Sequence, residues 1–106
     1  MVKEGAESPG PATILALHQH LTYLHLGGNI IAAIRPRQLP SSLKQLYLSY
    51  NQLEEAHFLK ELQSLEQLWI YNNKLSSIGL QGNERLRELW IQDNPLIVKH
   101  LPPSVQ

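Results

Sequence analysis

The feature that most constrains this chain is a sequence pattern that occurs four times along its 106 residues. The pattern reads L-x-x-L-x-L-x-x-N-x-L, where each L stands for an aliphatic residue. Its copies are LTYLHLGGNII, LKQLYLSYNQL, LEQLWIYNNKL and LRELWIQDNPL, which begin at residues 21, 43, 65 and 86. Successive copies are 22, 22 and 21 residues apart, so every copy is expected to form the same structural unit.

The alternation at the centre of each copy predicts a short β-strand. In the second copy, the side chains of Leu46 and Leu48 point to one side of the strand. Those of Gln45, Tyr47 and Ser49 point to the other side. Strands joined by a constant crossover are parallel, and such crossovers are right-handed. A single repeat cannot bury its own leucines, so the stability of the array comes from neighbouring repeats that stack on one another.

The four copies resemble leucine-rich repeats over about residues 12–101. The period of 22 residues, together with Ala56, Leu59 and Leu62 in the second repeat, resembles the intracellular subclass found in the regulatory subunit of type-1 protein phosphatase. The resemblance implies an α/β fold, a right-handed solenoid of about four full repeats. Its concave face would carry a parallel sheet, and its convex face short helices or turns. In the first repeat, Pro36 and Pro40 restrict the convex segment to an extended or one-turn path.

The repeats also predict the organisation of the chain. Residues 1–10 are polar and rich in Gly, Pro and Ser, which indicates disorder. Residues 11–20 are expected to form an N-terminal cap or half-repeat, with a short helix over residues 12–20. The repeats themselves are predicted at residues 21–42, 43–64, 65–85 and 86–101, followed by a tail at residues 102–106. Because this tail contains no recognisable cap, we expect the chain to be a fragment or truncated isoform of a longer repeat protein.

The ninth position of every copy is asparagine. After each strand the chain turns inward and leaves backbone groups that need hydrogen-bond partners. A short amide side chain carries donors and an acceptor, so it can satisfy these groups. We therefore predict a structural asparagine ladder. Its members are Asn29, Asn51, Asn73 and Asn94.

The strand positions that face away from the core are unusually aromatic. The central column, between the two core aliphatics of each strand, contains His25, Tyr47, Trp69 and Trp90. The column before it contains Tyr23, Gln45, Gln67 and Glu88. The column after it contains Gly27, Ser49, Tyr71 and Gln92. With Tyr50 at the rim, this face accounts for every Tyr and Trp of the chain, and Phe58 alone lies on the convex side.

We predict that this face binds a protein partner. Tyr and Trp are the residues most enriched at binding hot spots, and charges at the rim would tune partner choice and association rate. The predicted partner-binding residues are Tyr23, His25, Lys44, Tyr47, Tyr50, Glu66, Trp69, Tyr71, Arg87, Glu88 and Trp90. Two different roles for these rings stay open. Neighbouring rings stabilise a sheet by about 0.2 to 1 kcal/mol per pair, and a missing segment of a longer protein would also cover them.

Other classes of function have little support in the sequence. Nine basic and nine acidic residues give a net charge of zero, so no direct contact with nucleic acid is expected. No glycine-rich phosphate loop, nucleophile elbow or paired-carboxylate motif indicates an enzyme. The five histidines lack ligand spacing and the chain has no cysteine, so we expect neither a metal nor a cofactor. No apolar run approaches the roughly 20 residues that cross a bilayer, so no membrane association is expected.

The sequence favours a regulatory, targeting or scaffold role. The lack of cysteines, glycosylation sequons and a signal sequence predicts a cytoplasmic location, with the nucleus and the cilium as alternatives. We expect a monomer, either free or within a larger complex. Two alternatives stay open for the function: a structural or assembly segment of a longer repeat protein, and a subunit of a ribonucleoprotein that contacts protein.

Overall fold

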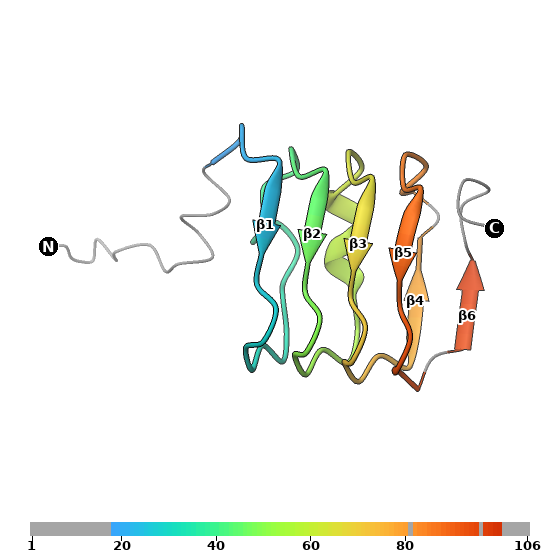
Figure 1. The fold of residues 1–106 in the computed structure, drawn as a ribbon. Coiled ribbons are helices and arrows are strands. Elements are labelled where there is room, and N and C mark those ends of the chain that lie inside the picture. Colours follow the sequence, from blue (N-terminus) through green and yellow to red (C-terminus); the bar gives the residue numbers. More distant parts are fainter. Residues whose placement is uncertain (1–17, 81, 96, 101–106) are drawn as a thin grey trace, which may run out of the picture.

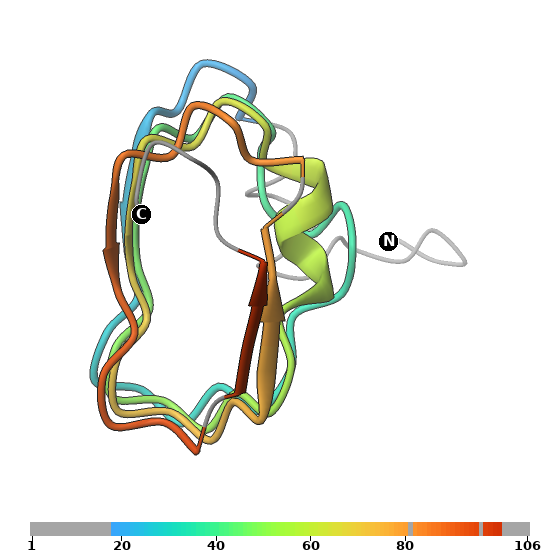
Figure 2. The same ribbon diagram turned by 90° about the vertical axis from the view of Figure 1, so that its right-hand side faces the viewer.

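Successive repeats form coils that lie side by side in a computed structural model (Figure 1). The structure describes residues 18–80, 82–95 and 97–100. Four strands form one parallel sheet in the order β1-β2-β3-β5. They are β1 (Tyr23–His25), β2 (Gln45–Tyr47), β3 (Gln67–Trp69) and β5 (Glu88–Trp90). Figure 2, which looks along the row of coils, shows this sheet on one side and the remaining segments on the other.

The strands are in register, so equivalent positions of the repeats are direct neighbours. Leu24 pairs with Leu46, Leu46 with Leu68, and Leu68 with Leu89. Leu46 and Leu68 are fully buried, whereas Leu24 and Leu89, in the two edge strands, are partly exposed. The difference arises because an inner repeat is covered from two sides, as expected for an array in which each unit contacts only its neighbours.

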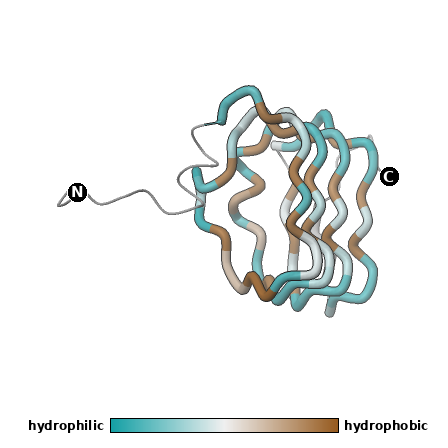
Figure 3. Tube along the Cα trace, turned by 60° about the vertical axis from the view of Figure 1, so that its left-hand side comes forward, coloured by the Kyte–Doolittle hydropathy of each residue, from teal (hydrophilic) through white to brown (hydrophobic). Residues whose placement is uncertain are grey.

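The hydrophobic core fills the space inside the coils. Leucines and isoleucines of the strands and turns meet the apolar residues of the opposite side, which include Ala56, Phe58, Leu59 and Leu62. Figure 3 shows the hydrophobic residues alternating with polar ones along the strands. This alternation is the one that the repeat pattern predicts, since side chains of a strand point to opposite faces in turn. The core therefore leaves one complete face of the sheet outside.

The side opposite the sheet differs from repeat to repeat. In the first repeat, residues 32–42 form no helix or strand and turn at residues 36–37 and 41–42, in agreement with the restriction that two prolines impose. In the second, the 3-10 helix η1 (His57–Glu61) buries Phe58 and Leu59 against the core. In the third, the strand β4 (Ser77–Gly79) pairs in parallel with β6 (Ile97–His100) of the fourth. This second small sheet corrects the expectation of helices or turns alone. Ile78, which is 2% exposed between two small residues, is β-branched and favours a strand.

The predicted terminal segments fall mostly outside the described residues. This holds for the disorder predicted at residues 1–10, for positions 12–17 of the predicted helix and for the tail at residues 102–106. Residues 18–20, the end of the predicted helix, contain a turn.

The asparagines of the repeat pattern form hydrogen bonds between neighbouring coils. Asn51 Nδ2 donates to the carbonyl oxygens of Leu48 in its own repeat, at 2.9 Å, and of Leu26 in the preceding one, at 3.0 Å. Its Oδ1 accepts from the backbone N–H of Ile31, also in the preceding repeat, at 3.0 Å. Asn73 and Asn94 make the equivalent bonds one and two repeats further on. Each of these side chains thus ties its own turn to the turn before it.

Two asparagines differ from that arrangement. Asn29 is exposed, and its Nδ2 donates only to Leu26 and Gly27 of its own repeat among the described residues. Asn83 lies outside the repeat pattern yet is 1% exposed. Its Nδ2 donates to the carbonyl oxygens of Leu59 and Leu62 at 2.9 and 3.0 Å, so it caps the end of η1. The repeat pattern gave no indication of this residue because it belongs to no column of the motif.

The position before each asparagine has a left-handed backbone. The φ angles of Gly28, Tyr50, Asn72 and Asp93 are 75°, 60°, 56° and 59°. Glycine adopts this conformation freely, and asparagine and aspartate are the side chains that tolerate it best. Tyr50 is the bulky exception in the series. A left-handed residue with a large side chain costs about 1 to 2 kcal/mol, which makes this position a place to look for function.

Replacing Asn51 by alanine is expected to lower the free energy of unfolding by about 1 to 3 kcal/mol, because Leu26, Leu48 and Ile31 lose a partner in a mostly buried turn. Asn29→Ala is the matched control, since that side chain is exposed, and should change stability by no more than about 0.5 kcal/mol. Urea denaturation of both variants measures the difference. Equal losses in the two would contradict this account of the ladder.

Gly28→Ala is expected to lower the free energy of unfolding by about 1 kcal/mol through backbone strain alone, since φ is +75° and a new Cβ would have nothing within 4 Å. Gly79→Ala has the same open surroundings without the positive φ, so its effect should stay within about 0.5 kcal/mol. Thermal unfolding followed by circular dichroism compares them. A Gly28 variant as stable as the Gly79 variant would show that the turn does not require this conformation.

Candidate functional site

The outward positions of the four-stranded sheet, called the sheet face below, bring most of the chain's aromatic rings together. The pairing places Tyr47 between His25 and Trp69, and Trp69 beside Trp90. The rings of His25 and Tyr47 stack with centroids 4.2 Å apart and an angle of 9° between their planes. Those of Tyr47 and Trp69 stack at 5.7 Å and 23°. In-register parallel strands thus convert one motif position into a column of stacked rings.

Two further tyrosines extend this column to one side. Tyr71 meets Tyr47 edge to face with centroids 6.2 Å apart, and their hydroxyl oxygens are 2.6 Å apart in a hydrogen bond. That bond, together with desolvation and the neighbouring tyrosines, raises the pKa of Tyr47. Tyr50 meets Tyr71 edge to face at 5.5 Å and is 57% exposed. The left-handed backbone of Tyr50 therefore presents its ring at the surface of the cluster.

The ring column is interrupted between Trp69 and Trp90. Although these two residues are partners in the sheet register, Trp90 makes no ring contact among the described residues and is 43% exposed. Its Nε1 instead donates to Glu88 Oε2 at 2.9 Å. An open depression of about 330 Å³ lies at this interruption. It is lined by Tyr47, Trp69, Tyr71, Trp90 and Gln92.

A row of polar side chains runs beside the rings. Gln45 Nε2 donates to Gln67 Oε1, and Gln67 Nε2 donates to Glu88 Oε1 at 2.7 Å. The hydrogen bonds from Trp90 and Gln67 hold the pKa of Glu88 below its usual range, with a smaller contribution from Arg87. Both carboxylate oxygens of Glu88 therefore have a fixed orientation, and the group is ionised at neutral pH. The sequence placed Glu88 in the outward column that also contains Gln45 and Gln67, and in the structure it pairs with Gln67 within the sheet face.

Gly27 makes room for the first stacked pair. A Cβ at this position would lie 2.8 Å from Cδ1 of Tyr47, closer than such contacts allow, and 3.1 Å from Cε1 of His25, which is a tight contact. Any larger residue would therefore shift the Tyr47 ring. The glycine thus belongs to the construction of the sheet face, although the motif itself does not require it.

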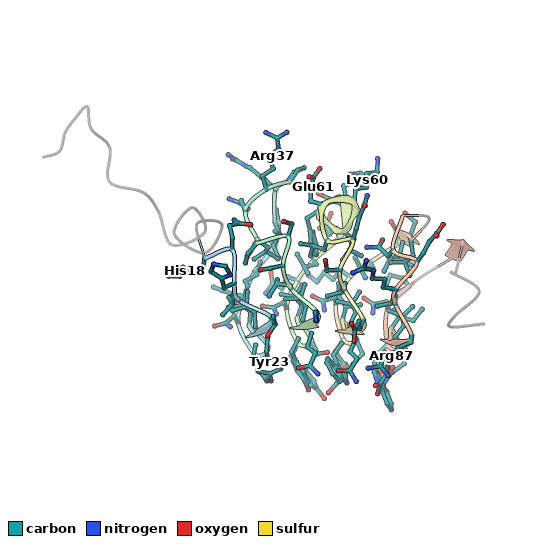
Figure 4. All side chains as sticks on the ribbon, turned by 90° about the horizontal axis from the view of Figure 1, so that it is seen from above. His18, Tyr23, Arg37, Lys60, Glu61 and Arg87 are labelled. Carbon is teal, nitrogen blue, oxygen red and sulfur yellow. The ribbon has the colours of Figure 1, made fainter. Side chains whose placement is uncertain are left out.

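The remaining predicted binding residues border this cluster. Arg87 and Glu66 form an ion pair with 3.3 Å between Nη2 and Oε1, and such exposed pairs contribute little to stability. Lys44 and Tyr23 are exposed, Tyr23 by 48%. Figure 4 shows Tyr23 and Arg87 on the sheet side of the molecule, away from Lys60 and Glu61 of η1. The face and the opposite side are therefore well separated, which allows controls on the far side.

One assignment to the sheet face is wrong, and one residue was overlooked. Ser49 is fully buried, because the chain turns inward there, and its Oγ accepts from the backbone N–H of Tyr71 at 3.2 Å. Gln92, in the same column, lines the depression but was not among the predicted binding residues. Its position beside Tyr71 in the repeat pattern was the available signal.

Two further kinds of feature, a metal site and a membrane-spanning helix, were sought within the described part of the chain. Its His, Asp and Glu residues form no group of three or more that could hold a metal ion. The described residues also include no helix with the length and apolar character that a bilayer-spanning segment needs.

Comparison with protein families matches two repeat families. The family described as "Leucine Rich repeats (2 copies)" matches residues 41–82, and the FNIP Repeat family matches residues 16–59. Asporin of Bos taurus is 33% identical over 67% of this chain, and nephrocan of Mus musculus is 36% identical over 71%. The matches cover 20% of asporin and 15% of nephrocan, so this chain spans only a small part of either relative.

Solved structures resemble the fold as a whole. A leucine-rich-repeat protein of Leptospira interrogans superposes on 78% of this chain with a TM-score of 0.72 and 26% identity. An internalin of Listeria monocytogenes superposes on 80% with a TM-score of 0.69 and 27% identity. The superposed regions cover 22% and 26% of those chains. Together with the family match, these structures confirm the predicted fold class.

The lowered pKa of Glu88 predicts a pH-dependent contribution to stability. A carboxyl group with a lowered pKa stabilises the fold above its unfolded-state pKa, about 4.3, and loses that contribution as the pH falls through the lowered value. The unfolding free energy of the wild type should therefore fall more steeply than that of Glu88→Gln as the pH drops below about 5. Urea denaturation of both proteins at a series of pH values below and above about 5 measures this difference in unfolding free energy. Parallel pH profiles would show that the two hydrogen bonds do not stabilise the ionised form.

Proposed function

Because this chain is a leucine-rich-repeat protein, and such proteins generally mediate protein–protein interactions, we propose that its sheet face binds a protein partner. The observation that carries the proposal is the exposure of large aromatic residues at the cluster's edges. Tyr23, Tyr50 and Trp90 are 48%, 57% and 43% exposed. Tyr and Trp in such positions supply large contact areas with little loss of side-chain freedom on binding.

Stacking within the sheet does not account for these residues. Ring contacts with neighbouring strands do explain why aromatic rings occur at His25, Tyr47 and Trp69, since their stacking stabilises the sheet itself. Trp90, by contrast, has no ring partner among the described residues. Tyr50 is held in a conformation that costs about 1 to 2 kcal/mol for a bulky side chain, at a position where the other repeats have Gly, Asn and Asp. Such strain is typical of residues that serve function.

The finer features of the proposal follow from the sequence. The 22-residue period favours the intracellular subclass, and the lack of cysteine favours the cytoplasm, nucleus or cilium. In that setting the chain would act as a monomer or within a complex, in a regulatory, targeting or scaffold role. Of the other predicted contact residues, His25 would belong to the central column, and Lys44, Glu66 and Arg87 would form the border of the interface.

A second candidate function is that of a segment in a longer repeat protein. Leu24 and Leu89, in the outermost strands of the sheet, are partly exposed, while their inner counterparts are fully buried. Further repeats stacked on these strands would bury them. In that case assembly would depend on the edge leucines and be indifferent to the aromatic residues.

The double substitution Trp69→Ala and Trp90→Ala is expected to abolish partner capture, since it removes two hot-spot residues, and each such residue contributes about 2 kcal/mol or more. Affinity capture followed by mass spectrometry compares this variant with the wild type. The matched control is Lys60→Ala with Glu61→Ala on the exposed surface of η1, which should capture the same proteins as the wild type. Circular dichroism verifies that both variants fold.

The two candidate functions give opposite results in this experiment. Loss of the same proteins from the double tryptophan variant alone supports binding through the sheet face. Undiminished capture by the folded tryptophan variant would overturn the proposal. Loss of captured proteins on changing Leu24 and Leu89 to a polar residue, with the fold retained, would then favour the assembly role.

A further inference from the structure

The depression between Trp69 and Trp90 has a chemical character that the rest of the sheet face lacks. Four of its five lining residues are aromatic, namely Tyr47, Trp69, Tyr71 and Trp90. The faces of such rings carry negative electrostatic potential and attract cations that approach within about 6 Å of the ring centre, with Trp the strongest. At about 330 Å³, the depression is at the lower end of the range for ligand sites, about 300 to 1,000 Å³, and suits one side chain.

An oriented anion, which is not itself a lining residue, is hydrogen-bonded to one of these rings. Glu88 Oε2 accepts from Nε1 of Trp90, one of the lining residues, and Oε1 accepts from Gln67. Both donors are neutral. No ion pair includes Glu88 within the described residues, and the neighbouring Arg87 is paired with Glu66 instead. Each carboxylate oxygen has a second lone pair, so Glu88 can still accept hydrogen bonds from a ligand.

A partner that covers the sheet face would therefore have to neutralise the carboxylate of Glu88. Removing a carboxylate from water is costly unless a cation pairs with it. The basic residues of this chain near the face, Lys44 and Arg87, are exposed at its border. Within the face, the side chains that form hydrogen bonds with one another or with Glu88 are uncharged glutamines, tyrosines and tryptophan. A cationic group from the partner would neutralise Glu88 and contact the ring faces at the same time.

We propose that the depression between Trp69 and Trp90 receives an arginine side chain of the protein partner, with the guanidinium stacked on the rings and paired with Glu88. This inference rests on the proposed function, binding of a protein through the sheet face. Arginine fits better than lysine because its planar guanidinium both stacks on aromatic rings and makes two parallel hydrogen bonds to a carboxylate. Gln92 adds an amide at the edge of the same site.

The two tryptophans of the chain make the site directly observable. Both line the depression, so the intrinsic tryptophan fluorescence of the protein responds to a ligand bound there. The probe is a short, blocked Gly-Ser peptide with a central arginine, and its control is the same peptide with citrulline, a neutral side chain of nearly the same shape. We expect saturable quenching by the arginine peptide, with an affinity about tenfold higher than that of the citrulline peptide. Raising the salt concentration should reduce this difference.

Substitutions separate the charge from the rings. Glu88→Gln should weaken arginine-peptide binding about fivefold or more and leave citrulline-peptide binding unchanged. Glu61→Gln, on exposed η1, is the matched control and should change neither. Trp90→Leu should weaken arginine-peptide binding, whereas Trp90→Phe, which retains a ring, should preserve most of it. Trp69 remains as the fluorophore in both Trp90 variants.

The results distinguish this inference from the function on which it rests. Equal affinities for the arginine and citrulline peptides, or no saturation by either up to about 20 mM, would overturn the arginine site. Protein capture that still depends on Trp69 and Trp90 would then leave the proposed function intact. Arginine-specific binding without any effect of the two tryptophans on capture would instead support the site and contradict the function.

Discussion

The hydrogen bonds between neighbouring coils are the constraint on which the rest of this structure depends. Where each strand ends, the chain turns inward and buries backbone groups that no strand pairing can satisfy. Asn51 and Asn73 supply the missing partners, and each reaches back to the preceding repeat. Neighbouring turns are thereby held at one distance and in one orientation. The register of the sheet, in which every equivalent position is a direct neighbour, follows from this arrangement.

That register places the residues at one position of the four repeats next to one another on the sheet face. Parallel strands lie about 4.8 Å apart, which is close enough for flat rings at equivalent positions to stack. His25, Tyr47 and Trp69 do so, and the glutamine row beside them ends at Glu88. The same geometry that stabilises the array therefore also builds the candidate site. Rings that stack on one another also hold the sheet, whereas Tyr50 and Trp90 at the edges are exposed, and Trp69 both stacks on Tyr47 and lines the depression beside Trp90.

Much of this was predictable because the motif repeats. The core leucines, the strands, their parallel pairing and the aromatic column all follow from a period-two pattern in a constant frame. Two kinds of feature were not predictable: residues outside the columns of the motif, and residues at which the strand alternation ends. Asn83 is buried under η1 although nothing in its spacing indicates a role. Ser49 was placed on the surface by alternation, yet it is buried, since strand alternation ends where the chain turns inward.

The sequence by itself thus determined the architecture and the identity of the outward face, because both depend only on which residue types recur at which spacing. Tertiary structure alone decided which of the outward residues are free to bind. The gap between Trp69 and Trp90, the hydrogen bond that holds Trp90 to Glu88, and the strained backbone of Tyr50 depend on side-chain rotamers and φ angles. The packing of neighbouring coils sets these in three dimensions, and residue spacing carries no information about them.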